Sequence, residues 1–402
     1  MEKDMMNNKK RKIAIYTGNR AEYGLQYPII KAIDSHPDLD YFLLVSGAHL
    51  QEEFGKTVDE ISNDGFNVYS EVKIEMLEDS VFSTARAIGT GILNLGPILE
   101  EISPDFLVVY ADRFEGFSAV ITGSQMNIPV AHIEGGDITE GGALDDSVRH
   151  AMTKLSHIHF TTNEEASERI RRLGEEPWRI FNVGFPVIDL IKAGNFSTPD
   201  EIVSQFQIDI NKPILLFTQH SITTEIESAA EQIRQSLNAL EILAKEGVQV
   251  IVTYPNNDAG AKSIILEIEH LKSKNISNIQ IYRSLGRYNY HGFLNLCGKI
   301  TQGVCVGNSS SGIKETPAFG CPTVNIGSRQ KGRLRSVNVL DVDYDTSQII
   351  EACKKAIYDK KFRQISKDCE NPYGKGNAGK QISNILATID LNNRLLQKKM
   401  TH

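Results

Sequence analysis

Short apolar runs alternate with longer stretches of helical periodicity along most of the 402 residues. In runs such as residues 12–17 (KIAIYT) and 106–111 (FLVVYA), apolar side chains stand at nearly every position rather than at every second one. A strand of this kind has to be covered on both faces, which is typical of a parallel sheet whose strands are connected by helices. The alternation therefore predicts the α/β class.

The alternation occurs twice, with a pause near Gly184, Phe185 and Pro186. At roughly 150 residues per domain, the length favours two or three domains. We expect two Rossmann-like, doubly wound domains at residues 1–185 and 186–375, and a helical segment at 376–402 that packs back on the first domain. The expected strands lie at 12–17, 41–47, 106–111, 129–134, 213–219, 248–253, 278–282, 299–306 and 322–326, and the expected helices at 21–36, 50–62, 80–101, 115–126, 142–155, 225–244, 258–273, 311–319, 346–358 and 376–398.

The charge and cysteine content narrow the functional classes. The 43 basic and 51 acidic side chains give a net charge of -8, whereas proteins that coat nucleic acid or anionic membranes carry surplus Lys and Arg. No apolar run approaches the roughly 20 residues that cross a bilayer, and the polar start lacks the apolar region of a signal peptide. The five cysteines form no CxxC pair, which favours buried thiols in a cytoplasmic protein over disulfides or a zinc site.

Polar residues follow several of the expected strands, where ligands bind in doubly wound sheets. Arg20 follows the first strand at a helix start, which suits a phosphate. Asp112 and Glu134 follow two later strands that are expected to be neighbours. Two carboxylates in one pocket push their pKa values apart, so that one can act as acid and the other as base. A surface arginine and two helix N-caps are the purely structural alternatives.

Three further segments carry candidate residues. Asp145 and Asp146 open a charged helix start with Arg149, which alone is more typical of a solvated helix end. In the second half, His220 ends a strand among polar neighbours, with a neutral core histidine as the alternative. Asn256 follows the next strand.

The stretch GNSSSGIKE at residues 307–315 follows an apolar strand and precedes a helix. Its glycines and serines would direct backbone N–H groups and hydroxyls at an anion. The spacing matches neither a Walker A loop nor a GxSxG elbow, and a flexible Ser-rich turn is the structural alternative. A nucleotide diphosphate with its ribose fits the pattern best. The candidate residues for that ligand are Ser309, Ser310, Gly312 and Glu315, with Arg329 and Arg333 after the next strand.

Together these stretches resemble the hydrolysing UDP-N-acetylglucosamine 2-epimerases of sialic acid biosynthesis. The first loop, GNRAEYG, is similar to the hydrolysing branch rather than to the GTRPE form of the non-hydrolysing one. The matching pieces run in order along nearly the whole chain: GNRAEYGL at 18–25, ADRFE at 111–115, HIEGG at 132–136, LDDSVRHAMTKLSH at 144–157, TQHSITTE at 218–225, YPNNDAG at 254–260, GNSSSGIKE at 307–315 and NIGSRQKGR at 325–333.

The resemblance implies a two-domain fold of the GT-B type with the nucleotide sugar in the cleft, no cofactor or metal, and a homodimer or homotetramer. The implied reaction eliminates UDP from UDP-GlcNAc across C1–C2, and hydration of the resulting 2-acetamidoglucal then gives N-acetylmannosamine. By resemblance, Asp112 and Glu134 are the acid/base pair, and Asp145 or Asp146 is an assisting carboxylate. The implied diphosphate and ribose groups are Arg20, Arg113, His220, Ser309, Ser310 and Glu315.

One loop departs from the family pattern. Between the HIEGG motif and the Asp pair, the chain reads DITEGGALDD, which is longer and richer in glycine than the SGTxDD form of the GlcNAc enzymes. The departure fits a related branch that acts on UDP-2,4-diacetamido-2,4,6-trideoxyglucose in legionaminic acid biosynthesis, although UDP-GlcNAc is placed first. A GT-B glycosyltransferase and a non-catalytic nucleotide-sugar sensor are the alternatives of other classes.

Overall fold

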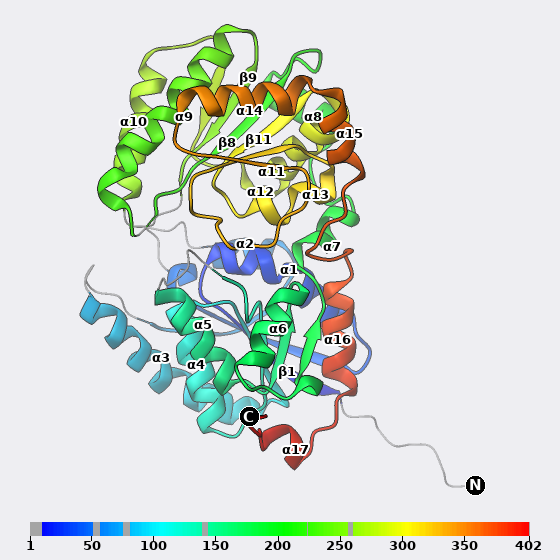
Figure 1. The fold of residues 1–402 in the computed structure, drawn as a ribbon. Helices are drawn as coiled ribbons and strands as arrows, with labels where there is room; N and C mark the ends of the chain where they lie inside the picture. The colour runs from blue at the N-terminus through cyan, green and yellow to red at the C-terminus, as the bar shows by residue number, and fades with distance from the viewer. Residues whose placement is uncertain are drawn as a thin grey trace. The chain divides into compact units, whose positions relative to one another are not determined.

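The computed structural model describes residues 10–50, 57–74, 81–138, 144–222, 224–255 and 260–401, without the side chains of Arg20, Ala21 and Val81. The chain forms two compact units, each built on one parallel sheet. Unit 1 comprises Met1–Asp137, Leu144–Asp189 and Gly374–His402, and unit 2 comprises Ile138–Ala143 and Leu190–Tyr373. Two parallel sheets covered by helices confirm the predicted α/β class with two domains (Figure 1).

The sheet of unit 1 has the strand order β3-β2-β1-β4-β5-β6-β7, and all its pairs are parallel. The order reverses between β1 and β4, which is the topological switch point of a Rossmann-like sheet. Both central strands are apolar and buried, as their sequences require. The strands are β1 (Arg11–Thr17), β2 (Leu39–Ser46), β3 (Val68–Val72), β4 (Phe106–Tyr110), β5 (Val130–Ile133), β6 (Ile158–Thr161) and β7 (Ile180–Asn182).

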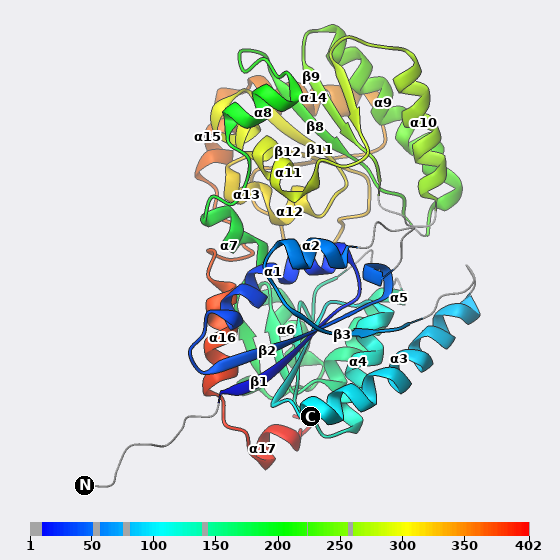
Figure 2. The ribbon, with the colours of Figure 1, turned by 180° about the vertical axis from the view of Figure 1, so that it is seen from behind.

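Helices cover both faces of this sheet, each with its own apolar core. One core joins the sheet to α1 (Arg20–Asp34), α2 (Val58–Asn63), α16 (Ala378–Thr388) and α17 (Asn393–Leu396). The other joins it to α3 (Val81–Ile102), α4 (Phe114–Gln125) and α5 (Leu144–Leu155). The last helices of the chain therefore belong to unit 1, where α16 lies beside α1 (Figures 1 and 2). The remaining helices are α6 (Glu164–Arg172) and α7 (Val187–Lys192).

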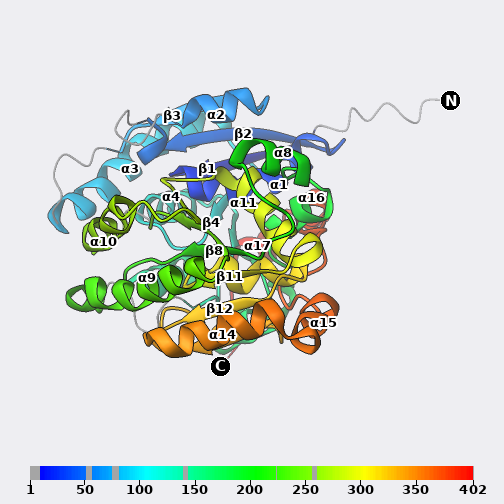
Figure 3. The same ribbon diagram turned by 90° about the horizontal axis from the view of Figure 1, so that it is seen from above.

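The sheet of unit 2 repeats the same plan, with the order β10-β9-β8-β11-β12-β13 and a switch point between β8 and β11. Helices α9, α10 and α14 share one apolar core with it (Figure 3). The strands are β8 (Ile214–Thr218), β9 (Gln249–Thr253), β10 (Ile279–Tyr282), β11 (Gly303–Gly307), β12 (Thr323–Ile326) and β13 (Val339–Val342). The helices are α8 (Pro199–Phe206), α9 (Ala229–Lys245), α10 (Ala261–Ser273), α11 (Gly286–Asn295), α12 (Ser311–Lys314), α13 (Thr316–Phe319), α14 (Thr346–Tyr358) and α15 (Lys360–Asp368).

Several expected elements differ from the observed ones. The helix expected at 50–62 lies partly outside the described residues, and its described part is α2, from Val58. The strand expected at 299–306 begins only at Gly303, because Leu296–Ile300 forms a π-helical turn. The helix expected at 311–319 is two short helices separated at Glu315, and the segment 376–398 holds α16 and α17 rather than one helix. Strands β3, β6, β7 and β13 were not predicted.

The predicted buried thiols are confirmed for four of the five cysteines, while Cys369 is partly buried. None of the helices in the described part of the chain is long and apolar enough to cross a membrane.

Candidate active site

The loop after β1 is held by two side chains of its own helix. Asn19 caps α1, because its Oδ1 accepts a hydrogen bond from Glu22 N at 3.0 Å. The carboxylate of Glu22 accepts from Gly18 N at 2.9 Å. Burial raises the pKa of Glu22 to about 8 despite this hydrogen bond. The backbone of Arg20 thus starts α1 at the switch point, while its side chain lies outside the described part of the structure.

The loops after β4 and β5 contain two strained residues. Ala111 and Glu134 both adopt left-handed φ values, of 54° and 65°, although neither is glycine. Such conformations cost roughly 1–3 kcal/mol and gather at functional sites. Each follows the end of a buried strand, and its left-handed conformation turns the chain sharply at the carboxyl edge of the sheet. Asp112 and Glu134 are the acidic residues that these two turns present, as the sequence predicted.

Arg149 on α5 joins three segments at this edge. Its guanidinium is 3 % exposed and forms an ion pair with Asp112. It also donates to Asp146 Oδ1 at 2.8 Å and to the main-chain oxygen of Asp137 at 2.7 Å. Asp112 and Asp146 therefore bind the same buried cation, whereas the Asp145 residue is exposed. A buried guanidinium shared by two carboxylates stabilises a concentration of negative charge that burial alone would disfavour.

Glu134 is 7 % exposed and lies beside the hydroxyl of Tyr110. Burial raises the pKa of Tyr110 well above its usual value, and the Glu134 carboxyl adds to the rise. Tyr110 therefore stays protonated and polar at the base of the acidic loops. Arg113 is half exposed and approaches Glu115 at 3.4 Å. Among the described residues, no group of three or more His, Cys, Asp or Glu side chains is arranged to hold a metal ion.

Asn308 joins the loops at the switch point of unit 2. Its Oδ1 accepts from His220 N at 2.7 Å, and its Nδ2 donates to His220 O at 2.9 Å. Its main-chain oxygen accepts from Gln330 Nε2 at 2.8 Å and from Arg329 Nη1 at 3.2 Å. The loops after β8, β11 and β12 are thus tied to one fully buried amide. Gly307 precedes it at φ 126°, and a Cβ there would collide with Thr218 O.

The Ser-rich loop leads into a single helical turn rather than a long helix. Ser310 is the N-cap of α12, which spans only Ser311–Lys314. Its helix dipole is therefore small, and the groups that this loop offers to an anion are the backbone N–H groups and hydroxyls of Ser309 and Ser310. Gly312 is buried, and a Cβ on it would lie 3.1 Å from the Thr323 side chain.

Glu315 is oriented by two donors that use the same oxygen. Its Oε2 accepts from His291 Nε2 at 2.8 Å and from Ser311 Oγ at 2.9 Å. Burial by itself would raise the pKa of Glu315, but the His291 and Ser311 hydrogen bonds hold it below its usual value. The other oxygen can accept hydrogen bonds from hydroxyl groups of a ligand.

His220, Arg329 and Arg333 surround the same switch point. Burial, together with the positive charge of Arg329, lowers the pKa of His220 to about 3, so the imidazole is neutral near pH 7. Arg333 donates to Ile138 O at 2.7 Å and to Gln330 Oε1 at 2.9 Å. Asn256, the remaining predicted residue of this unit, lies outside the described residues.

The structure therefore groups the predicted residues by unit, with Asp112, Glu134 and Asp146 in unit 1 and His220, Ser309, Ser310, Glu315, Arg329 and Arg333 in unit 2. Sequence reasoning did not assign Arg149, Asn308 or His291. For Arg149 a signal was present, since it stands three residues after Asp146 on an expected helix. Asn308 and His291 act through partners that only the folded chain brings near.

Several known proteins are similar to this chain over most of its length. The family model for UDP-N-acetylglucosamine 2-epimerase matches residues 31–387. A Legionella pneumophila protein described as UDP-N,N'-diacetylbacillosamine 2-epimerase (hydrolyzing) is 34% identical over 96% of this chain and 98% of its own length. The UDP-N-acetylglucosamine 2-epimerase of Neisseria meningitidis is 31% identical over 86% of this chain and 87% of its own.

Solved structures share the fold. The Neisseria meningitidis UDP-GlcNAc 2-epimerase bound to UDP-GlcNAc superposes with a TM-score of 0.79 at 21% identity, over 93% of this chain and 99% of that one. A Listeria monocytogenes structure described as a UDP-N-acetylglucosamine 2-epimerase reaches 0.75 at 17% identity, over 94% and 96%. The expected GT-B-like, two-domain fold is thereby confirmed.

Proposed function

Because this chain belongs to the UDP-N-acetylglucosamine 2-epimerase family, we propose that it is a hydrolysing 2-epimerase, which converts a UDP-activated 2-acetamido sugar and water to UDP and the free sugar inverted at C2. The observation that carries the proposal is the buried Arg149, which binds both Asp112 and Asp146, with Glu134 at the end of the neighbouring strand β5. This reaction requires a base and an acid on opposite faces of C2. Carboxylates on separate strand ends can meet that requirement.

The proposed reaction has two steps, an elimination and a hydration. In the first step, a carboxylate of unit 1 removes the C2 proton and the C1–O bond to the diphosphate breaks. UDP departs, and the sugar becomes a 2-acetamidoglucal. Water then adds at C1, while a proton from the opposite face restores C2 with the manno configuration. We assign the acid and base roles jointly to Asp112 and Glu134. Asp146 is the assisting carboxylate, because Arg149 holds it in the same cluster as Asp112.

Unit 2 is proposed to bind the UDP group. The backbone and hydroxyls of Ser309 and Ser310 suit the diphosphate, and Arg329 adds positive charge beside them. Glu315 is proposed to accept hydrogen bonds from the ribose hydroxyls, since its two protein partners share one oxygen. Arg20, Arg113 and Arg333 are proposed as further groups for the departing diphosphate.

For the sugar, we propose UDP-2,4-diacetamido-2,4,6-trideoxyglucose, the compound also named UDP-N,N'-diacetylbacillosamine. Two relatives at 34% and 33% identity carry that substrate in their descriptions. The loop before Asp145 is longer and richer in glycine than in the GlcNAc enzymes, which also favours the diacetamido sugar. UDP-GlcNAc, the first expectation from the sequence, is the second candidate, because the Neisseria relative at 31% is described by it. The product would enter legionaminic or sialic acid biosynthesis, respectively.

The test compares UDP release from the two UDP sugars offered separately, with kcat/KM for each. The proposal expects the diacetamido sugar to be preferred and its product in heavy water to carry deuterium at C2. Preference for UDP-GlcNAc would reverse the assigned sugar, and product without deuterium would exclude the elimination mechanism. A glycosyltransferase would release UDP rapidly only when an acceptor is present.

Two substitutions test the residue roles. We expect Asp112→Asn and Glu134→Gln to abolish UDP release while UDP affinity stays close to that of the wild type, because neither carboxylate is among the groups proposed to bind UDP. Both changes preserve side-chain size, so we expect both variants to fold. Circular dichroism checks this. Turnover at the wild-type rate in either variant would remove that residue from the mechanism. A sensor protein, by contrast, would bind UDP and show no turnover even before substitution.

A further inference from the structure

The last residues of the chain are bound closely to unit 1. Arg179 is fully buried and donates to Leu395 O and Arg394 O, at 2.7 Å each. Two guanidinium groups lie over the ring of Trp178, that of Arg179 at 4.2 Å and that of Arg394 at 4.6 Å from the ring centre. The backbone of α17 (Asn393–Leu396) is thereby tied to Arg179, which directly precedes β7, and Lys398 follows three residues after Leu395.

Lys398 binds the end of α5. Its ammonium donates to the main-chain oxygens of Lys154 at 2.7 Å and Ser156 at 2.6 Å, with a longer contact to Thr153 O at 3.3 Å. The last carbonyls of a helix have no partner within the helix, and a cation there also offsets the negative end of the helix dipole. Lys398 therefore caps the helix that carries Asp146 and Arg149 at its other end.

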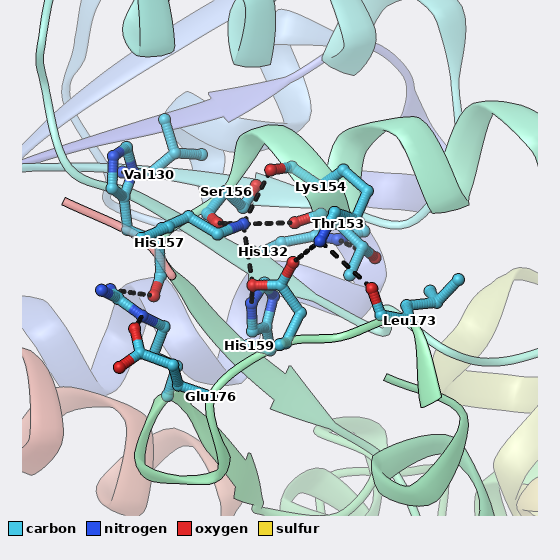
Figure 4. Close-up of polar contacts among 12 residues, drawn as sticks. Val130, His132, Thr153, Lys154, Ser156, His157, His159, Leu173 and Glu176 are labelled. Atoms are coloured by element: carbon cyan, nitrogen blue, oxygen red, sulfur yellow. Dashed lines mark hydrogen bonds and ion pairs between the residues drawn. The ribbon is translucent and has the colours of Figure 1, made fainter. Parts of the chain in front are cut away.

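A buried carboxylate completes the cap. Glu175 is 1 % exposed and binds Lys398 at 2.8 Å, Lys154 at 2.6 Å and His159 at 3.1 Å. Figure 4 shows the labelled His159, Lys154, Thr153 and Ser156 gathered around these contacts. Burial would raise the pKa of Glu175, but the hydrogen bonds from His159 and the two lysines lower it to about 2. Glu175 thus supplies the negative charge that keeps a largely buried ammonium in place.

A second route leads from the same helix end to Asp112. The hydroxyl of Thr153 meets His132 Nδ1 at 3.2 Å, and His132 Nε2 meets Ala111 O at 2.7 Å. A carbonyl can only accept, so Nε2 carries the proton and Nδ1 accepts from Thr153. Ala111 is the strained residue that precedes Asp112. Gly135 leaves room for this contact, because a Cβ there would lie 3.0 Å from both His132 Nδ1 and Thr153 Oγ1.

We propose that Lys398 is a positioning residue of the carboxylate site, and that the C-terminal segment acts as a clamp on α5. By holding the end of α5, Lys398 fixes the axial position of Arg149 and Asp146, and through Thr153 and His132 it fixes the turn that presents Asp112. The inference rests on the proposed function for the role of these carboxylates. Small displacements of such groups reduce turnover strongly, because proton transfer depends on geometry.

The test compares Lys398→Met with Lys399→Met. Methionine keeps the length of the Lys398 side chain and removes its charge, while Lys399 is an exposed neighbour that serves as the matched control. We expect Lys398→Met to lower kcat roughly tenfold to hundredfold with little change in UDP affinity, and Lys399→Met to behave as the wild type. Lys398→Arg should restore part of the lost kcat, because a guanidinium can also donate to several carbonyls. Wild-type kcat in folded Lys398→Met would overturn the proposal.

Hydrogen exchange measured by mass spectrometry gives a readout that does not depend on turnover. In Lys398→Met we expect faster exchange at the end of α5 and in the segment Tyr110–Arg113, with unit 2 unchanged. Faster exchange confined to residues 389–401 would show a locally anchored tail and refute the clamp. If the wild type processes neither UDP sugar, the proposed function fails, while the exchange result still decides whether Lys398 holds the two carboxylate-bearing segments.

Discussion

Arg149 shows how one side chain can organise a site at the scale of a single residue. It is the buried cation that binds Asp112, Asp146 and the main chain of Asp137. Burying a guanidinium is expensive unless it is paired and fully hydrogen bonded, and removing it would leave two carboxylates near each other without compensation. Arg149 therefore fixes the positions of the two carboxylates and also stabilises the folded state.

We expect Arg149→Met to reduce kcat by about 100-fold or more while UDP affinity is retained. It should also lower the free energy of unfolding by about 3–5 kcal/mol, the usual cost of leaving buried charges unpaired. The measurements are UDP release, UDP binding by calorimetry and urea unfolding. Arg172→Met is the control, because that arginine is 76% exposed in its pair with Glu168. Turnover close to the wild-type rate in folded Arg149→Met would show that the carboxylates keep their geometry without the cation.

At the scale of elements, the junction of β8, β11 and β12 depends on the buried amide of Asn308. We expect Asn308→Ala to weaken UDP binding by about tenfold or more, because the N–H and carbonyl of His220 lose their partners, and each unsatisfied group costs about 1–3 kcal/mol. Asn308→Asp should weaken UDP binding further, since a carboxylate would repel the diphosphate. Calorimetric titration with UDP measures both. The exposed Asn211 of the same unit is the control for substitution to Ala, and unchanged affinity in Asn308→Ala would contradict the assigned role of the junction.

Buried histidines on and beside β5 and β6 make unit 1 sensitive to acid. Burial lowers the pKa of His132 to about 3 and those of His157 and His159 to about 4. Between about pH 6.5 and 4 the unfolded chain binds protons that the folded chain does not, so stability falls as the pH falls, by about 1.4 kcal/mol per pH unit for each histidine. Trp178 is the only tryptophan and lies in unit 1, so its fluorescence follows urea unfolding of this unit.

The urea midpoint should therefore decrease steadily from pH 7 toward pH 5. His159→Gln should make that decrease shallower, because the amide can still donate to Glu175 but does not titrate. A midpoint that stays constant over this range would show that the three imidazoles accept protons without cost in the folded state.

The elements that could be predicted from the sequence are those with an unambiguous pattern. Strand β4 is apolar at every position and β8 at all but its last, and both are buried on both faces. The acidic residues beyond β4 and β5 followed from the rule for strand ends. Edge strands β3 and β13 are short and carry polar residues, so their periodicity is weak. Arg149 and Asp112 are 37 residues apart, and Lys398 and Thr153 are 245 apart. Their contacts follow from the packing of α5 and the chain end, which no local pattern specifies.

At the scale of the whole molecule, the chain uses one sheet plan twice and gives each copy different chemistry. The switch point of unit 1 gathers carboxylates around a cation, while that of unit 2 gathers hydroxyls, an amide and arginines. Because the two sets belong to separately packed units, substitutions of the unit 1 carboxylates are expected to change turnover, and those at the unit 2 junction to change UDP affinity. The family resemblance also predicted a homo-oligomer, for which the surface of α3 is informative.

The exposed face of α3 favours self-association. Residues 81–99 contain one charged side chain, Arg86, and Phe82 and Leu93 are 70% and 76% exposed. Positions eleven apart lie on the same side of a helix, so these two side chains lie on one side of α3, with the exposed Arg86 between them. We expect a second copy of this chain to cover Phe82 and Leu93, because such a contact would remove two large, exposed apolar side chains from water.

Analytical ultracentrifugation of the wild type, Leu93→Asp and Leu266→Asp checks this expectation. Leu266 on α10 is 70% exposed, like Leu93. Its neighbours on the helix surface include the charged Lys262 and Glu269, so it serves as the control leucine. The wild type and Leu266→Asp should sediment as the same oligomer, and Leu93→Asp should shift to a smaller species. A monomeric wild type, or a Leu93→Asp variant with the wild-type mass, would show that α3 faces solvent in the working protein.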